Sequence, residues 1–307
     1  NKEVTILVAT SGDTSSAVAN GFFDADGIKV VILYPSGRVS SIQEKQLTTL
    51  GGNITALEID GTFDDCQKMV KNAFFDKILQ SHLHLISANS INIARLLPQS
   101  VYYAWAWRNH DGKKPIIFSV PSGNFGNISG GLFAKKMGLP VEKLIAATNE
   151  NDIFPKYLKN GNVIPQTTCQ TISNAMDVAI PSNLDRIKKL FNNDIEKIKE
   201  DISSWCFSDK ETKQTIYNIK KLTRYLTEPH TAVGILGLET YRKQTKSRSK
   251  GIVLGTAHPS KFANVIEPII GKKLDLSPQL RLIQKKEKHS IKLSNEFQKL
   301  KNYLLGK

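Results

Sequence analysis

The sequence predicts an α/β fold of two lobes, each with an open, mostly parallel sheet flanked by helices. Three observations carry this prediction. Short runs rich in Val and Ile alternate with segments of helical spacing, which is typical of parallel sheets with right-handed crossovers. These runs are apolar at nearly every position, as expected of strands covered on both faces. The length of 307 residues fits roughly two domains of about 150 residues.

The apolar runs and the helical patterns predict the elements in order. Strands are expected at residues 4–9, 29–33, 54–59, 84–87, 115–120, 144–147 and 252–254. Helices are expected at residues 15–23, 41–50, 63–80, 93–108, 126–136, 231–243 and 294–305. Residues 1–88 are expected to form a smaller lobe and residues 89–307 a larger one. A charged stretch with few strand signals predicts a helical insertion at about residues 183–225.

The composition argues against several classes of protein. No run of 18 apolar residues occurs, so no membrane partner is expected. The net charge of +14 comes mostly from scattered Lys residues without a nucleic-acid-binding motif, so we interpret it as a solvated surface and expect no nucleic-acid partner. Cys66, Cys169 and Cys206 form no CxxC pair, which suits reduced thiols in the cytoplasm. His82 and His84 lack a third ligand, so no metal is expected.

Ligands of open α/β sheets bind beyond the carboxyl ends of the strands, so strand-to-turn junctions are the places to search. The first such junction holds Ser11, Gly12, Asp13 and Thr14, between a strand and a helix. Small residues at a helix N-terminus leave backbone amides that can bind a carboxylate or phosphate. An ordinary helix cap is the alternative, and the residues alone do not decide between the two.

A second junction runs from Ser119 through Gly123, Asn124, Phe125, Gly126 and Asn127. Glycines permit positive φ and close approach of the backbone to a ligand, and free amides in such a turn can form a nest for phosphate. The pattern matches neither GxGxxG nor GxxxxGK[ST], so it supports neither a dinucleotide fingerprint nor a P-loop. A tight turn without a ligand is the alternative.

Two further junctions carry polar side chains. Asn89 and Ser90 follow a strand, and Arg95 lies about one turn into the next helix, where it can bind phosphate or remain a surface residue. After the last apolar run, Thr256 offers a neutral hydroxyl, and His258 is either a general base or a structural residue. Together the four junctions predict a phosphorylated cofactor and an anionic substrate.

Taken together, these stretches resemble the threonine synthase family of pyridoxal-phosphate (PLP) enzymes, of fold type II (tryptophan synthase β-like). The resemblance rests on an ordered set of motifs: ATSGDT, LYPSGRVSSIQEKQLTTLGGNI, SANSINIARLLPQ, SVPSGNFGN, AATNENDIFPKYL, TISNAMDVAIPSN, EPHTAV and LGTAHPSKF. Neither SGNFG nor TSGDT would be specific alone, but the ordered set runs nearly end to end.

The resemblance implies a role for each matching residue. Those expected to bind the cofactor are Gly123, Asn124, Phe125, Gly126 and Asn127 for its phosphate and Thr256 for its pyridine nitrogen. Those expected to bind the substrate are Ser11, Gly12, Asp13 and Thr14 at its carboxylate end and Asn89, Ser90 and Arg95 at its phosphate. The implied reaction converts O-phospho-L-homoserine and water to L-threonine and phosphate, a carbon–oxygen lyase reaction that ends threonine biosynthesis.

One departure concerns the lysine that carries PLP in this family, which precedes TSGDT in a Phe-Lys-Asp context. Lys2 has no such context, so the Schiff-base lysine is expected upstream of this chain, together with the N-terminal domain of the family. The chain by itself is therefore expected to be inactive. The alternatives are a non-catalytic homologue that binds PLP or substrate, and another fold type II enzyme such as a dehydratase or cysteine synthase.

Overall fold

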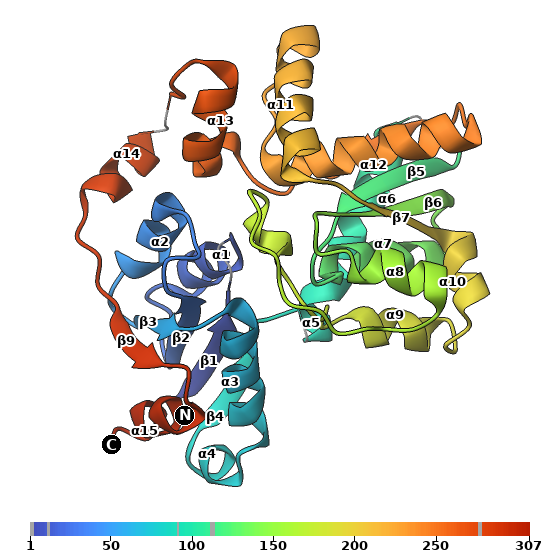
Figure 1. The fold of residues 1–307 in the computed structure, drawn as a ribbon. Helices are drawn as coiled ribbons and strands as arrows, with labels where there is room; N and C mark the ends of the chain where they lie inside the picture. Colours follow the sequence, from blue (N-terminus) through green and yellow to red (C-terminus); the bar gives the residue numbers. More distant parts are fainter. Residues whose placement is uncertain (1–2, 11–12, 91, 111–113, 276–277) are drawn as a thin grey trace. The chain divides into compact units, whose positions relative to one another are not determined.

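The computed structural model describes residues 3–10, 13–90, 92–110, 114–275 and 278–307 (Figure 1). The chain divides into two compact units, of which the first comprises Asn1–Asn89 with Asp275–Lys307 and the second Ser90–Leu274. The C-terminal stretch, which we expected in the second lobe, thus belongs to the first unit. The expected division at 88/89 lies one residue from the first crossing between the units.

The first unit contains a five-stranded parallel sheet. Its strand order is β4 (His84–Ser87), β1 (Val4–Ala9), β2 (Ile28–Pro35), β3 (Ile54–Asp60) and β9 (Ile291–Ser294). Its helices are α1 (Asp13–Phe22), α2 (Ser41–Thr48), α3 (Phe63–Phe75), α4 (Lys77–His82), α14 (Pro278–Lys285) and α15 (Phe297–Leu304). Every pairing of neighbouring strands is parallel, as the apolar runs predicted.

Both faces of this sheet are covered. Ile6 and Ile32 pack with Val18 of α1 in one buried cluster. Leu7 and Val31 point to the other face, because side chains alternate along a strand, and they too are fully buried. The helix α3 packs on β1 and β2, and α15 packs on α3. This two-sided cover explains why the strands are apolar at nearly every position.

The helix expected at residues 63–80 is two helices, α3 and α4, which meet at Asp76. The backbone of Asp76 is extended, with ψ of 113°, so α3 ends there. Its side chain accepts hydrogen bonds from the amides of Ile78 and Leu79 at 3.0 Å each, which starts α4. Asp is among the strongest N-cap residues, so the break has a local cause.

The strand β9, which the sequence patterns did not predict, returns the C-terminal segment to the first sheet. It pairs with β3, with Ile291 opposite Leu57. Two ion pairs precede it, because Lys288 Nζ lies 2.6 Å from Glu44 Oε1 and 2.7 Å from Glu58 Oε2.

The carboxylate of Glu58 is the centre of this anchor. Burial by itself would raise the pKa of Glu58, but hydrogen bonds from Lys288, Ser36 and Ser290 outweigh it and lower this pKa to about 2. Partial burial by itself would lower the pKa of Lys288, but its hydrogen bonds with Glu44 and Glu58 outweigh burial and raise this pKa. The ion pair is therefore present throughout the neutral pH range.

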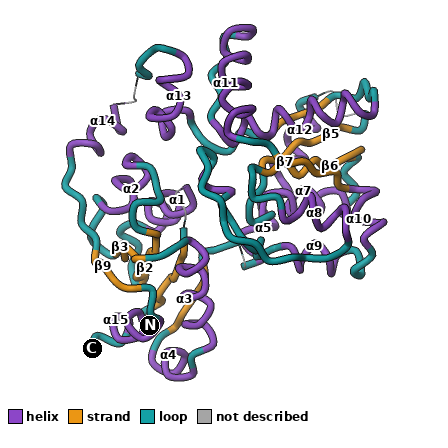
Figure 2. The backbone as a smooth tube through the Cα atoms, in the orientation of Figure 1, coloured by secondary structure: helices purple, strands orange, loops and turns teal. Residues whose placement is uncertain are grey.

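The second unit contains a four-stranded parallel sheet, of which Figure 2 shows β5, β6 and β7 side by side. Its strand order is β7 (Ile202–Cys206), β6 (Val141–Thr148), β5 (Ile116–Pro121) and β8 (Gly251–Val253). Its α-helices are α5 (Ile93–Leu96), α6 (Ser100–Arg108), α7 (Gly126–Lys136), α8 (Ile153–Asn160), α9 (Leu184–Leu190), α10 (Ile195–Asp201), α11 (Asp209–Thr223), α12 (Pro229–Thr245) and α13 (Ala263–Ile270). Short 3-10 helices are η1 (Leu97–Gln99), η2 (Asn174–Met176) and η3 (Pro259–Phe262).

Helices cover both faces of this sheet as well. The long helix α12 packs against all four strands. On the other face, Phe118 and Leu144 join a buried cluster with Tyr103 of α6, Leu132 of α7 and Ile198 of α10.

Two predictions for the second unit are corrected by the structure. The stretch expected to be a helical insertion contains β7, which pairs with β6, so this region extends the sheet as well as contributing helices. The helix expected at residues 93–108 is divided into α5, η1 and α6. Pro98 stands in η1, and because proline lacks an amide hydrogen it cannot continue the helical hydrogen bonding of the preceding turn.

Candidate active site

The turn between β5 and α7 places five consecutive backbone amides at the start of a helix. Among the described residues, no hydrogen-bond acceptor pairs with the amides of residues 123–127, which we call the amide cradle. Phe125, the N-cap of α7, has a left-handed backbone with φ of 58°. A left-handed residue beside a helix start turns successive amides inward, and such nests bind phosphate groups. The five residues predicted to hold a cofactor phosphate therefore form a turn of the kind that binds phosphate.

The strained conformation of Phe125 is held by packing. Its side chain is only 1% exposed, and its ring lies 4.6 Å from the ring of Phe154. A left-handed backbone costs a residue with a Cβ roughly 1–2 kcal/mol, so this burial is what keeps the cradle in shape.

Asn127 holds the cradle through its side chain. Its Oδ1 accepts hydrogen bonds from Ser122 Oγ at 2.7 Å and from the Ile128 amide at 2.9 Å. Its Nδ2 donates to the carbonyl of Pro121 at 2.8 Å. The side chain of Asn127 thus stabilises the turn. The backbone amide of Asn127 is the group left to bind a ligand.

At two glycines of the cradle, neighbouring atoms leave no room for a side chain. A Cβ on Gly123 would lie 2.6 Å from Met176 Cα, and a Cβ on Gly126 would lie 3.0 Å from Ser90 Cβ. Segments remote in sequence therefore pack directly on the cradle backbone.

Residues 174–183, here called the clasp segment, form one of these neighbours. Asn124 Oδ1 accepts hydrogen bonds from the amide and the hydroxyl of Ser182, each at 3.1 Å. Asn183 Nδ2 donates to the carbonyl of Asn124 at 2.9 Å and to Ser90 Oγ at 3.0 Å. Sequence reasoning assigned no role to this segment, although it lies within the motif TISNAMDVAIPSN.

Buried polar groups anchor the N-terminal side of the clasp segment. Asp177 Oδ1 accepts hydrogen bonds from Thr171 Oγ1 at 2.7 Å and from Asn149 Nδ2 at 2.8 Å. Asp177 Oδ2 accepts from the Thr171 amide at 2.9 Å. Burial raises the pKa of Asp177 to about 6, although these hydrogen bonds favour the charged form.

Thr256 follows β8, the strand that pairs with β5. Because parallel neighbours end at the same edge of a sheet, Thr256 and the amide cradle lie beyond the same edge. Its side chain is exposed, so its hydroxyl is available to a ligand. His258, left open as a general base or a structural residue, caps η3 through its Nδ1, which lies 2.7 Å from Ser260 Oγ and accepts from the Ser260 amide at 3.2 Å.

Ser90 and Arg95 lie in the same unit as the cradle. Ser90 packs against Gly126 and shares Asn183 with Asn124. Arg95 is on α5 and is half-buried, and burial lowers the pKa of its guanidinium. An arginine in a desolvated position gains more from an anion than an exposed one does.

The remaining predicted substrate residues belong to the first unit. Ser11 and Gly12 lie outside the described residues, and Asp13 and Thr14 begin α1. The side-chain amide of Asn89 pairs with Ala9, because Oδ1 accepts from the Ala9 amide at 2.9 Å and Nδ2 donates to its carbonyl at 2.5 Å. The structure therefore shows Asn89 fixing the end of β1, where the predicted substrate loop begins.

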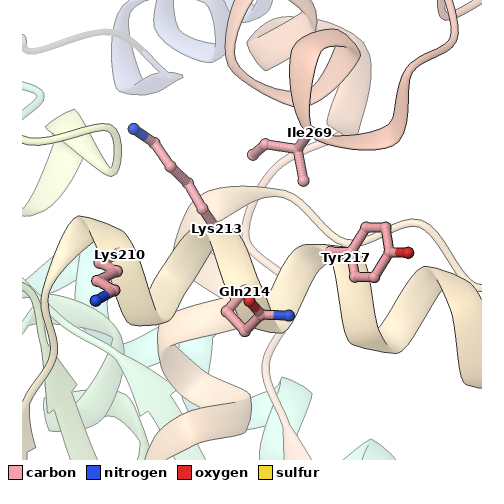
Figure 3. A pocket seen from close by; sticks show the side chains of 5 residues that line it. All are labelled: Lys210, Lys213, Gln214, Tyr217 and Ile269. Atoms are coloured by element: carbon pink, nitrogen blue, oxygen red, sulfur yellow. The ribbon is translucent and has the colours of Figure 1, made fainter.

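A pocket of about 440 Å³ in the second unit contains none of the predicted site residues. Figure 3 shows it lined by side chains of α11 and α13, namely Lys210, Lys213, Gln214, Tyr217 and Ile269. Within the described residues, no cluster of three or more His, Cys, Asp or Glu could hold a metal, and no helix could span a membrane.

Comparison with known proteins agrees with this geometry. Residues 1–256 match the family model described as "Pyridoxal-phosphate dependent enzyme", and residues 231–304 match "Threonine synthase, C-terminal". Threonine synthase from Serratia marcescens is 46% identical over 305 residues, which are 99% of this chain and 70% of that protein.

Two solved structures support the same relationship. The crystal structure of threonine synthase from Escherichia coli matches with a TM-score of 0.93 and 45% identity, covering 99% of this chain and 71% of that one. The X-ray structure of PLP-bound threonine synthase from Brucella melitensis matches with a TM-score of 0.86 and 35% identity, covering 99% and 70%.

The fold and the amide cradle define a PLP-dependent enzyme, and the cradle fits the cofactor because five free amides can receive its phosphate dianion. The chain belongs to the threonine synthase family, and its function is that of this family of lyases in threonine biosynthesis. The match to the threonine synthase model favours this function over a dehydratase or a cysteine synthase.

Proposed function

We propose that the substrate is O-phospho-L-homoserine, which is converted with water to L-threonine and phosphate. One observation carries the proposal: Ser90 packs against Gly126 of the amide cradle and shares Asn183 with it. A second phosphate site at Ser90 and Arg95 would thus adjoin the cofactor site, as a substrate with its own phosphate requires.

On the cofactor side, the amides of residues 123–127 hold the phosphate group. The hydroxyl of Thr256 faces the pyridine nitrogen. A neutral hydroxyl does not force that nitrogen to stay protonated, as a carboxylate partner would. When bound, PLP supplies an electron sink for the loss of protons from the substrate's Cα and Cβ.

On the substrate side, Arg95 binds the phosphate and Ser90 donates a hydrogen bond to it. The Cγ–O bond breaks and the phosphate leaves with the electron pair, which these two residues stabilise. A proton is then added at Cγ, water supplies a hydroxyl to Cβ, a proton returns to Cα, and the remaining proton of the water ends on the released phosphate. We assign binding of the substrate's carboxylate end to residues 11–14, which follow the end of β1 where Asn89 pairs with Ala9.

The test uses a form of the protein that includes the Schiff-base lysine expected upstream of residue 1, and supplies it with PLP and either O-phospho-L-homoserine or L-serine. We expect threonine and inorganic phosphate in equal amounts from the first compound and no product from the second. Ammonia and pyruvate from L-serine would replace the proposal with a dehydratase. Retention of PLP without product from either compound would identify a non-catalytic homologue.

A further inference from the structure

The motif EPHTAV begins α12 with a buried, hydrogen-bonded Glu–His pair that the reaction above does not use. Glu228 and His230 are 1% and 3% exposed, and His230 Nδ1 lies 2.7 Å from Glu228 Oε2. Burial by itself would raise the pKa of Glu228, but His230 and Thr231 outweigh it and keep this pKa below its usual value. A buried carboxylate is costly unless its oxygens accept hydrogen bonds, and both oxygens of Glu228 do so.

The hydrogen bonds of His230 fix its tautomer. The Ala175 amide donates to His230 Nε2 at 3.2 Å, so Nε2 carries the lone pair. Glu228 is an acceptor, so Nδ1 carries the hydrogen and donates to it. The carboxylate of Glu228 therefore determines which ring nitrogen of His230 can accept the hydrogen bond from the Ala175 amide.

On one side, this arrangement reaches the amide cradle. Ala175 belongs to η2, at the start of the clasp segment. A Cβ on Gly123 would lie 2.6 Å from Met176 Cα and 2.9 Å from the Ala175 carbonyl oxygen, so η2 is a wall of the cradle. A displacement of Ala175 is therefore a displacement of that wall.

On the other side, the same turn of α12 reaches the segment around Thr256. The His230 ring packs edge-on against Phe262 of η3, with centroids 5.1 Å apart. Thr231 Oγ1 donates to Glu228 Oε1 at 2.6 Å and lies 3.8 Å from where a Cβ on Gly255 would be. The first turn of α12 thus contacts both parts of the proposed cofactor site.

We propose that Glu228 and His230 are positioning residues that keep the amide cradle and the Thr256 turn in register for the cofactor. Glu228 orients the imidazole, and His230 holds η2 against Gly123 while its ring supports Phe262. The inference rests on the proposed roles of the cradle and of Thr256, and it assigns function to residues that touch neither substrate nor cofactor.

The test measures binding of pyridoxine 5'-phosphate to the full chain by calorimetry, because this compound lacks the aldehyde and binds without a covalent bond. We expect His230→Leu to bind about tenfold more weakly, since it leaves the buried Ala175 amide without an acceptor. His230→Gln keeps an acceptor for this amide, so its affinity should stay within about threefold of wild type. Ile198→Ala is the control, because it opens a cavity at α10, a helix that packs mainly on α8, α9, β6 and β7.

A second readout does not depend on the cofactor. Hydrogen exchange of the peptide spanning residues 171–183 should be faster in His230→Leu than in His230→Gln or Ile198→Ala. Wild-type affinity and exchange in His230→Leu would overturn the positioning role, and so would equal weakening by Ile198→Ala. Failure of the wild-type chain to bind pyridoxine 5'-phosphate would instead refute the cofactor site, and the positioning role with it.

Discussion

Gly123→Ala tests the amide cradle by adding a single methyl group to it. The new Cβ would lie 2.6 Å from Met176 Cα and 2.9 Å from the Ala175 carbonyl oxygen, both of which are backbone atoms. To restore an ordinary contact of about 3.4 Å, one backbone must move by roughly 0.8 Å. Overpacking of this kind typically lowers the free energy of unfolding by about 1–3 kcal/mol.

The same displacement should weaken cofactor binding. Amide–phosphate hydrogen bonds require separations of about 2.7–3.2 Å, so a shift of roughly 0.8 Å would break one or more of them. We expect pyridoxine 5'-phosphate to bind at least about tenfold more weakly, measured by calorimetry, with the stability loss measured by urea unfolding.

Gly21→Ala is the matched control, because a Cβ there meets nothing within 4 Å and the residue lies in α1. This substitution should raise the free energy of unfolding by about 0.5–1 kcal/mol and leave binding unchanged. If Gly123→Ala behaved like Gly21→Ala in both urea unfolding and calorimetry, the clasp segment would not pack on the cradle as described.

Three further predictions concern other contacts. In a form that includes the upstream lysine and turns over, Arg95→Ala should raise the KM for O-phospho-L-homoserine about 10–100-fold without changing PLP affinity. Arg108→Ala, at an exposed site on α6, is the control and should change neither quantity. If the two variants had equal KM values, Arg95 would not bind the substrate. Lys288→Met should lower the free energy of unfolding by about 1–3 kcal/mol at pH 7. Because the folded-state pKa of Glu58 is lowered from 4.5 to about 2, that difference should persist above pH 4.5 and vanish as the pH falls through about 2, as acid titrations of both proteins would show. Cys66 is fully buried, and burial raises the pKa of its thiol, so mass spectrometry after native iodoacetamide treatment should find it unmodified while the two exposed cysteines react.

Local signals predicted most of the fold. The apolar runs at residues 4–9 and 84–87 coincide with β1 and β4, and the other predicted strands overlap those of the structure. The strands β7 and β9 were missed because their sequences, ISSWC and IKLS, are short and partly polar, as edge strands often are. The helix breaks at Asp76 and Pro98 had recognisable local causes that the wider helical periodicity concealed.

The candidate site, too, has parts that local sequence predicted and parts that it did not. The cradle could be predicted because its chemistry is contained in one stretch, in which a strand, two glycines and a helix start are consecutive. The interpretation of Asn89 as a direct ligand of phosphate stays a prediction, to which the structure adds its two hydrogen bonds with Ala9. His258 could not be judged from sequence, because its cap to Ser260 appears only in the folded turn.

The sequence by itself therefore determined the α/β class, the amide cradle and the order of the family motifs, because strand periodicity and turn chemistry act over a few residues. Only the tertiary structure decided that the C-terminal segment completes the first sheet, that the clasp segment packs on Gly123, and that His230 receives the Ala175 amide. These contacts join residues 50 or more positions apart. Their energies depend on burial and on distances of a few tenths of an ångström, which no local pattern encodes.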